Sequence, residues 1–176
     1  MTIQTLDYSD FEANAITLPQ WKSYRSRWVY HAKSIEIVRG LNISGPSAVL
    51  EIGAFGAGLV LGSNKMDLPG GSWPLPAQHL AIWHDARIIP WPFENGKFEL
   101  VIAMRVFHHL NPMQRECFME AKRIARNVLI ECPEWETIGE GITRAQFIEW
   151  NGGESPIVEH DMGAWGRLYL WKGDVI

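Results

Sequence analysis

The sequence predicts a domain of the α/β class, a three-layer sandwich with a mainly parallel sheet and an antiparallel last strand. Short apolar segments alternate with segments of helical spacing, and the apolar segments have no polar face, as is typical of strands buried in a parallel sheet. The chain of 176 residues is 47% apolar, which is enough for one buried core without disulfides or a structural metal. The predicted arrangement is Rossmann-like.

The first 46 residues are expected to form an N-terminal arm and an amphipathic helix, and residues 47–176 the Rossmann-like domain itself. Residues 1–20 have no sustained period and contain Pro19. From Trp21 to Val38, apolar residues recur at spacings of three and four, and a glycine follows as a stop signal. One helix with a basic outer side is therefore predicted after an irregular arm.

Three strands are predicted in the next third of the chain. The first covers residues 48–52 and is followed at once by a glycine-rich turn over residues 53–58. The second ends at Asp67, and only eight residues separate it from that turn, which is too few for a full crossover helix. The third covers residues 79–83 and leads into Asp85. An abbreviated connection between the first two strands is therefore expected.

The apolar run over residues 98–103 is typical of a central parallel strand. A helix is predicted after it, with Asn111 as the N-cap and Pro112 in the first turn. Asn127 is expected to end this helix.

The last part of the chain predicts one more helix and three strands. A strand covers residues 128–131, and Thr143 with Gln146 forms a capping-box pattern that starts a helix. Two short strand-like segments, residues 156–159 and 168–171, are close enough along the chain to pair in antiparallel fashion.

Charge and apolar patterning exclude several partners. The chain has 16 Lys and Arg against 20 Asp and Glu, a net charge of −4, and no run of like charges that is typical of nucleic-acid or membrane binding. No uncharged apolar stretch approaches the roughly 20 residues that span a bilayer, and the N-terminus does not resemble a signal peptide. We therefore expect a soluble protein without a nucleic-acid or membrane partner, while the oligomeric state, a homodimer included, stays open.

Metal and thiol chemistry are not expected. The six histidines and two cysteines show no Cys-x-x-Cys or His-x-x-x-His spacing. Cys117 lies on the inward stripe of a predicted helix and Cys132 ends a predicted strand, which are usual places for inert buried thiols. Two isolated cysteines also favour a reducing cytoplasm over a disulfide framework.

The carboxyl ends of the predicted strands bring together groups suited to a nucleotide-like ligand. In such sheets ligands bind beyond these ends, where the strand order reverses. Gly53 permits close approach to the backbone, and the two oxygens of Asp67 match the adjacent hydroxyls of a ribose. Asp85 can accept from an exocyclic adenine amine while the N–H of Ala86 donates to the ring.

Three stretches of the chain resemble the class I S-adenosylmethionine-dependent methyltransferases, especially the small ones grouped with the methyltransferase type 11 domain. The stretches are VLEIGAFGAG at 49–58, HDARIIPWPFENGKFELVIAMRVFHHL at 84–110 and EAKRIARNVLIECPE at 120–134. The second is the most specific, because its acidic-Ala pair, proline-aromatic turn, Phe-acid-apolar strand and His-His-Leu ending follow the family's order and spacing. The resemblance covers about residues 47–172.

The resemblance implies S-adenosyl-L-methionine as cofactor and transfer of its methyl group to a small-molecule acceptor. It assigns the methionine part to the turn after the first strand, the ribose and adenine to the acids of the next two strands, and the amino-acid end to the backbone at the end of the fourth. The residues so implied are Glu51, Gly53, Ala54, Phe55, Asp67, Leu68, Asp85, Ala86, Ala103 and Met104.

Two histidines follow the fourth strand, near the position expected for the transferred methyl group. His108 is the candidate general base for a protonated acceptor, because a histidine pKa near neutrality suits that role. His109 is expected instead to pack or to cap the following helix.

Two other functions remain as alternatives. The family loop usually reads acid-x-Gly-x-Gly-x-Gly, whereas Phe55 occupies the middle glycine position here. A non-catalytic relative with a structural or partner-binding role is therefore an alternative, and it predicts a pocket mouth plugged by Phe55 or Trp73. A nicotinamide-dependent enzyme requires Gly-x-Gly-x-x-Gly, which residues 53–58 do not supply.

Overall fold

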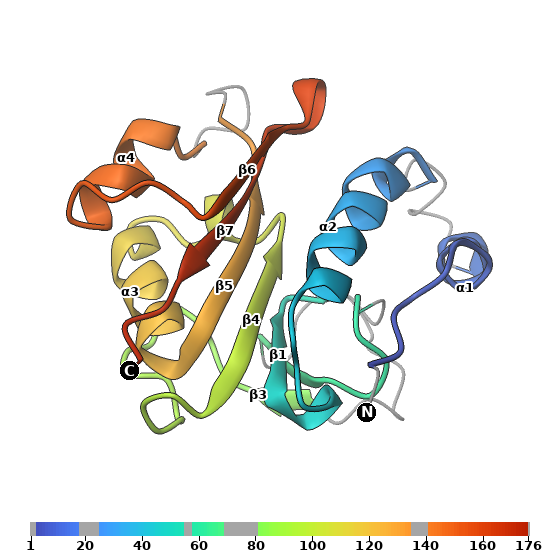
Figure 1. The fold of residues 1–176 in the computed structure, drawn as a ribbon, viewed down its shortest axis with the longest axis horizontal. Helices are drawn as coiled ribbons and strands as arrows, with labels where there is room; N and C mark the ends of the chain where they lie inside the picture. The colour runs from blue at the N-terminus through green and yellow to red at the C-terminus, as the bar shows by residue number, and fades with distance from the viewer. Residues whose placement is uncertain (1–2, 18–24, 55–57, 69–80, 135–140, 176) are drawn as a thin grey trace.

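The computed structural model describes residues 3–17, 25–54, 58–68, 81–134 and 141–175, and these form one sheet with helices on both faces (Figure 1). The strands are β1 (Val49–Ile52), β2 (Asn64–Asp67), β3 (Ala81–Trp83), β4 (Phe98–Met104), β5 (Ala125–Cys132), β6 (Val158–Asp161) and β7 (Arg167–Lys172). The helices are α1 (Tyr8–Thr17), α2 (Trp28–Gly40), α3 (Gln114–Ile124) and α4 (Arg144–Trp150), with short 3₁₀ turns η2 (Pro46–Ala48), η3 (Phe107–His109) and η5 (Gly163–Trp165).

The strand order of the sheet is β3-β2-β1-β4-β5-β7-β6. The first five of these strands are parallel, and β7 runs antiparallel to both β5 and β6. The predicted class, a Rossmann-like sandwich with an antiparallel last strand, is confirmed. The order reverses between β1 and β4, so the carboxyl ends of these two strands flank the point where ligands bind in such sheets.

Two apolar cores lie on opposite faces of the sheet. Along β4, Leu100 and Ile102 pack into the core beneath α2, and Val101 and Ala103 pack into the core beneath α3 and α4. This alternation follows from the two-residue period of a strand. Figure 1 shows α1 and α2 on one side of the sheet and α3 and α4 on the other. The helix pairs therefore complete the three layers.

The N-terminal segment differs from the prediction of an irregular arm, because residues 8–17 form α1. Phe11 is 1% exposed, and its ring lies 5.3 Å from that of Trp28 and 4.8 Å from that of His31. The N–H of Leu6 donates to the carbonyl of Leu59, which joins the segment to the domain. Packing against α2 stabilises a short helix whose own sequence carries little periodic signal.

The helix predicted from Trp21 is confirmed over its second half as α2, which begins at Trp28 after a 3₁₀ turn over residues 25–27. Trp21 lies outside the described residues. The abbreviated connection to β2 is seen as a turn over residues 58–63, in which Val60 forms an isolated antiparallel bridge with Thr5. The strand β2 then ends at Asp67, as predicted.

Both predicted ends of α3 are wrong. Asn111 and Pro112 form a turn, and the helix begins at Gln114 without a side-chain cap. Asn127 does not end the helix, because it lies within β5 opposite Leu100 and Lys172. Its side-chain amide donates to the Glu99 carbonyl, so an asparagine typical of a helix end is held here by the neighbouring strand.

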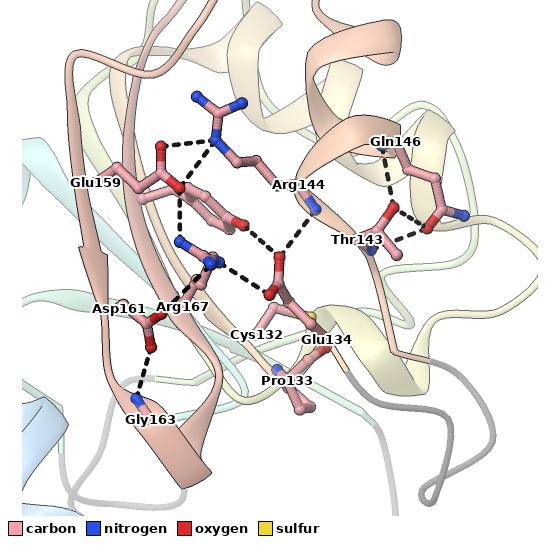
Figure 2. Close-up of polar contacts among 11 residues, drawn as sticks. Cys132, Pro133, Glu134, Thr143, Arg144, Gln146, Glu159, Asp161, Gly163 and Arg167 are labelled. Carbon is pink, nitrogen blue, oxygen red and sulfur yellow. Dashed lines mark hydrogen bonds and ion pairs between the residues drawn. The ribbon is translucent and has the colours of Figure 1, made fainter.

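The hairpin of β6 and β7 is confirmed as antiparallel, and a charged network joins it to the end of β5 (Figure 2). Arg167 contacts Glu134 at 2.8 Å and Glu159 at 3.0 Å, and Arg144 contacts Glu159 at 2.8 Å. The hydroxyl of Tyr169 donates to Glu134 over 3.2 Å. These contacts connect α4, β5 and the hairpin, and they position η5 at the hairpin's turn.

The capping box of α4 is confirmed: the N–H of Gln146 donates to the hydroxyl of Thr143, and the N–H of Thr143 donates to the amide oxygen of Gln146. We expect Thr143→Ala to lower the free energy of unfolding by about 1 kcal/mol, because it removes the acceptor for an otherwise unpaired helix N–H. Urea denaturation measures this. Thr143→Ser keeps the hydroxyl and is the control; equal losses in both variants would contradict the capping role.

Candidate functional site

A cavity of about 320 Å³ opens at the carboxyl ends of the first four strands of the chain. Its walls come from the ends of β1, β2 and β3 and from the segment that joins β4 to η3. The lining residues are Ile52, Gly53, Met66, Asp67, Leu68, His84, Asp85, Ala86, Arg87, Arg105, Val106, His109 and Leu110. Five of the ten residues implied for cofactor binding are among them: Gly53, Asp67, Leu68, Asp85 and Ala86.

Gly53 forms the bare floor of the cavity where β1 ends. Its φ of 61° lies in the left-handed region that favours glycine, and its N–H donates to the carbonyl of Met66. A Cβ at this position would lie 2.7 Å from Cγ2 of Val106 on the opposite wall. Any side chain here therefore displaces that wall. The next residue, Ala54, is half-buried, and Phe55 lies outside the described residues.

Glu51 is 2% exposed, and its carboxylate is bound by the connection between β1 and β2. It accepts the N–H of Leu59 at 2.6 Å, the N–H of Val60 at 3.0 Å and the hydroxyl of Ser63 at 2.6 Å. Burial raises the pKa of Glu51, and these hydrogen bonds oppose that shift. Glu51 therefore stabilises the turn between β1 and β2. It is not among the described residues that line the cavity.

Asp67 ends β2 with its carboxylate on the cavity. The N–H of Leu68 donates to Oδ1 at 2.8 Å, and within the described chain no hydrogen bond reaches Oδ2. The side chain is half-buried, and burial raises the pKa of Asp67. One carboxylate oxygen is therefore available to a ligand in partly desolvated surroundings, where hydrogen bonds to it are stronger than in water.

Asp85 follows β3 and forms an ion pair with Arg87, whose Nη2 lies 2.7 Å from Oδ2. The hydrogen bonds from the Arg87 side chain lower the pKa of Asp85, so the carboxylate is ionised at neutral pH. Ala86 is buried, and its carbonyl accepts Nε1 of Trp91 at 2.7 Å. That bond fixes the backbone that faces the cavity.

Ala103 and Met104, whose backbone is expected to lie near the amino-acid end of the cofactor, end β4. Ala103 is buried in the core, and Met104 contacts the hydroxyl of Ser34 on α2. Within the described chain the next two residues, Arg105 and Val106, line the cavity. Arg105 has a φ of 57°, a region that a non-glycine residue rarely adopts and that here turns the chain away from the sheet.

The surroundings of the two histidines of η3 are the reverse of those predicted: His109 lies at the cavity, and His108 is buried. His109, which was expected to pack or cap, is exposed and lines the cavity, with its ring 3.8 Å from that of His108. His108 is 2% exposed, and its Nδ1 has no hydrogen-bond partner among the described residues. Burial lowers the pKa of His108 to about 3, with further lowering by His109 and Arg105. His108 is therefore neutral at neutral pH, and the expectation of a near-neutral pKa does not hold.

A second buried titratable group, one to which the sequence pattern gives no role, lies beside the cavity. Glu131 near the end of β5 is 0% exposed, and Nη1 of Arg105 lies 3.6 Å from its Oε1. Burial raises the pKa of Glu131 to about 8, although Arg105 and Arg27 oppose the shift. In the sequence, Glu131 is a single acidic residue after a short apolar run. Only the register of β5 with β4 places it against Arg105.

The backbone of Trp165 contacts Arg105 of this ion pair. Nη1 of Arg105 donates to the carbonyl of Trp165 at 3.3 Å, and the ring of Trp165 meets that of Tyr30 edge-on at 5.8 Å. Trp165 belongs to η5, at the turn of the hairpin that the network of Figure 2 holds in place. The cavity and the buried pair therefore share Arg105 as a common wall.

Comparison with protein-family models gives no match, and comparison with curated protein sequences gives none either. Solved structures are similar in fold. The PH0226 protein from Pyrococcus horikoshii OT3 is matched with a TM-score of 0.61 at 14% identity, over 87% of this chain and 92% of that one. The methyltransferase domain of bacterial CtHen1 is matched with a TM-score of 0.54 at 14% identity, over 83% and 98%.

A further similar structure contains a ligand. The methyltransferase CalH, solved as a complex with SAH, has a TM-score of 0.53 at 15% identity, over 72% of this chain and 51% of CalH. At these identities the likeness defines the fold, which is that of the class I S-adenosylmethionine-dependent methyltransferases. The finer relation to the type 11 group stays a prediction.

Two observations concern other kinds of site. Within the described ranges, no group of three or more His, Cys, Asp or Glu side chains is arranged to hold a metal ion. No helix in the same ranges has the length and apolar character needed to cross a bilayer.

The buried carboxylate makes stability depend on pH. The pKa of Glu131 is about 8 in the folded chain against an ordinary value of 4.5, so the folded state keeps a proton that the unfolded state releases. Relative to Glu131→Gln, we expect the wild type to lose stability as pH rises from about 4.5 to 8, by at most about 1.4 kcal/mol per pH unit. Urea denaturation across this range measures the difference. Exposed Glu149→Gln is the control, and a flat difference for Glu131→Gln would contradict the shifted pKa.

Proposed function

We propose that the protein is an S-adenosylmethionine-dependent methyltransferase that acts on a small molecule. The observation that carries the proposal is the convergence of a bare turn and two carboxylates, from three adjacent parallel strands, on one cavity. The cavity volume of about 320 Å³ is within the range of small-ligand sites. The fold shared with methyltransferases of known structure supports the same conclusion.

The carboxylate of Asp67 is suited to the ribose, because Oδ2 is available and two carboxylate oxygens match two vicinal hydroxyls. Gly53 lets the ligand approach the backbone at the end of β1. Glu51 would act indirectly, since its carboxylate holds the connection that shapes this turn. Ala54 and Phe55 belong to the turn, and Leu68 follows the ribose acid.

The adenine would lie against Asp85 and Ala86. Arg87 already donates three N–H groups to the Asp85 carboxylate, from its backbone, Nε and Nη2. Nε also reaches Oδ2 at 3.2 Å, so an exocyclic amine would share these oxygens with Arg87. The apolar walls of Val106 and Leu110 would contact the ring faces. The backbone at Ala103 and Met104 leads into this wall and would lie nearest the amino-acid end.

The bound cofactor would supply an activated methyl group on a sulfonium. Displacement at that carbon is in line, so the protein's main task is to hold the acceptor roughly 3 Å away along one axis and to exclude water. Arg105 and His109 line the cavity after β4, and their side chains would face the acceptor. We keep His108 in the proposed site as a neutral hydrogen-bonding group, because its lowered pKa of about 3 makes it a weak base.

A small molecule fits the acceptor side better than a nucleic acid. The chain has a net charge of −4, and nucleic-acid binding depends on clustered cations that neutralise phosphates. The described cations at the cavity, Arg87 and Arg105, are both paired with carboxylates. We place the protein in the cytoplasm, where buried free thiols such as Cys117 and Cys132 stay reduced.

Binding of S-adenosylhomocysteine tests the proposal. Isothermal titration calorimetry is expected to give saturable binding to the wild type, and Asp67→Ala is expected to weaken it about 10-fold or more, because hydrogen bonds to a charged group contribute about 1.5–3 kcal/mol. Asp10→Ala, at an exposed position on α1, is the matched control and should bind as the wild type does. No heat from the wild type at high micromolar ligand, with an unchanged melting temperature, would remove the cofactor from the proposal.

The bare turn gives a second test. Gly53→Ala is expected to weaken S-adenosylhomocysteine binding about 10-fold, because the new methyl lies 2.7 Å from Cγ2 of Val106 and the φ of 61° disfavours alanine. Val106→Ala in the same chain removes the clash and should recover part of the affinity. The same calorimetric titration measures both. If Gly53→Ala binds as tightly as the wild type, the ligand does not pass over this turn.

A further inference from the structure

The carbonyl oxygen of Ala86 accepts two hydrogen bonds from the interior of the protein. Nε1 of Trp91 donates to it at 2.7 Å, and Sγ of Cys117 on α3 donates to it at 3.1 Å. Burial raises the pKa of the Cys117 thiol to about 12, so this thiol keeps its proton and can donate at neutral pH. A carbonyl oxygen has two lone pairs, and both are used here. The oxygen therefore cannot turn toward the cavity without losing two buried partners.

The peptide group between Ala86 and Arg87 is also fixed at its N–H. That N–H donates to Oδ1 of Asp85 at 3.0 Å, a bond that an aspartate commonly makes to the backbone two residues on. The N–H of Ala86, in contrast, has no acceptor within the described residues, although Ala86 is buried and lines the cavity. Buried backbone N–H groups normally have a partner, so this one is suited to a ligand in the cavity.

Trp91 is itself held by α3. It is 2% exposed, its N–H donates to Oε2 of Glu120 at 2.9 Å, and its carbonyl accepts Nη2 of Arg123 at 3.3 Å. Glu120 and Arg123 form an ion pair of 2.7 Å, so one pair of side chains binds both polar groups of the Trp91 backbone. Cys117, Glu120 and Arg123 follow one another at intervals of three and therefore lie on one side of α3. Of the described cavity-lining residues, none is among these four.

We propose that Trp91 and Cys117 are positioning residues for the adenine of the cofactor. Their hydrogen bonds to the Ala86 carbonyl hold the backbone so that the N–H of Ala86 donates to a ring nitrogen beside the exocyclic amine. The inference rests on the proposed function, because it requires an adenine in the cavity. It assigns part of the selectivity for adenine to two side chains that do not touch the ligand.

A positioning role and a merely structural role have different consequences for binding. If Trp91 and Cys117 only stabilise the fold, their loss weakens the binding of every nucleoside ligand by the same factor. If they direct one N–H, their loss matters most for ligands that carry the matching ring nitrogen. Changing the protein and the ligand together therefore isolates this one hydrogen bond, as a double-mutant cycle does for two residues.

Two analogues of S-adenosylhomocysteine supply the ligand change. The 1-deaza and 7-deaza analogues each lack one of the two ring nitrogens that flank the exocyclic amine. In calorimetric titrations the wild type should bind one of them about 10-fold more weakly than S-adenosylhomocysteine, because the Ala86 N–H then has no acceptor. In Trp91→Phe this affinity ratio should fall about 3-fold or more, since the carbonyl of Ala86 loses one of its two donors. The ratio for the other analogue should stay unchanged.

Trp171→Phe is the matched control. Trp171 is 0% exposed and lies in the same apolar core as Trp91, but its Nε1 has no hydrogen-bond partner among the described residues. The same substitution there removes an indole without removing a hydrogen bond, so both ratios should equal those of the wild type. Cys117→Ala is an independent variant in case Trp91→Phe does not fold, and it should lower the same ratio. Cys117→Ser keeps a donor and should restore most of that ratio.

The outcomes separate this inference from the cofactor proposal. Absence of S-adenosylhomocysteine binding in the wild type overturns the proposed function. With that binding retained, the inference alone is overturned when the wild type binds both analogues as tightly as S-adenosylhomocysteine. It is also overturned when Trp91→Phe and Cys117→Ala leave the ratio unchanged, whether or not they weaken all three ligands together, or when Trp171→Phe lowers the ratio equally.

Discussion

The hydrogen bonds of the Glu51 carboxylate are the constraint on which the site depends. A parallel sheet of this kind normally joins its first two strands through a crossover helix, whereas here the described part of that connection, residues 58–63, is a turn. Hydrogen bonds hold this turn in place of a helix: the Glu51 carboxylate accepts two backbone N–H groups and one hydroxyl. Gly58 allows this close approach, since a Cβ there would lie 2.6 Å from Oε1 of Glu51. The turn at Gly53 and the start of β2 are thereby fixed relative to each other.

This constraint explains why an acid at the end of a strand is not by itself a binding group. Glu51, Asp67 and Asp85 each lie at or near the carboxyl end of a strand, and the sequence pattern alone does not distinguish their roles. In the structure the first supports the chain, the second presents an available oxygen and the third is paired with Arg87. The difference comes from which neighbouring N–H groups each carboxylate meets, and that depends on the path of the connecting turns.

Much of the fold follows from the sequence because it depends on local pattern. The apolar runs that form β1, β4 and β5 are visible in one dimension, and so is the capping box of α4. α1 is not, because its stability comes from Phe11 packing on α2. Asn127 shows the same limit: its residue type favours a helix end, but pairing on both sides keeps it in β5.

The Glu131–Arg105 pair could not be predicted for a related reason. It requires the register of β4 against β5, the left-handed backbone of Arg105 and the burial supplied by α2, none of which is encoded near either residue. Burial also determines the protonation of His108 and Glu131. The same desolvation lowers the pKa of His108 and raises that of Glu131, because it disfavours the charged form of each.

The surroundings of Arg105 depend on elements that lie far apart in the sequence. Tyr30 of α2 meets Trp165 of the hairpin turn at 5.8 Å, and Nη1 of Arg105 donates to the carbonyl of Trp165. The position of Trp165 in turn depends on the ion pairs of Arg167 with Glu134 and Glu159, shown in Figure 2. A change in that surface network would shift Trp165 and, through its carbonyl, the Arg105 side chain that lines the cavity. The surface ion pairs of Arg167 are therefore coupled to the cavity wall through one hydrogen bond between Arg105 and Trp165.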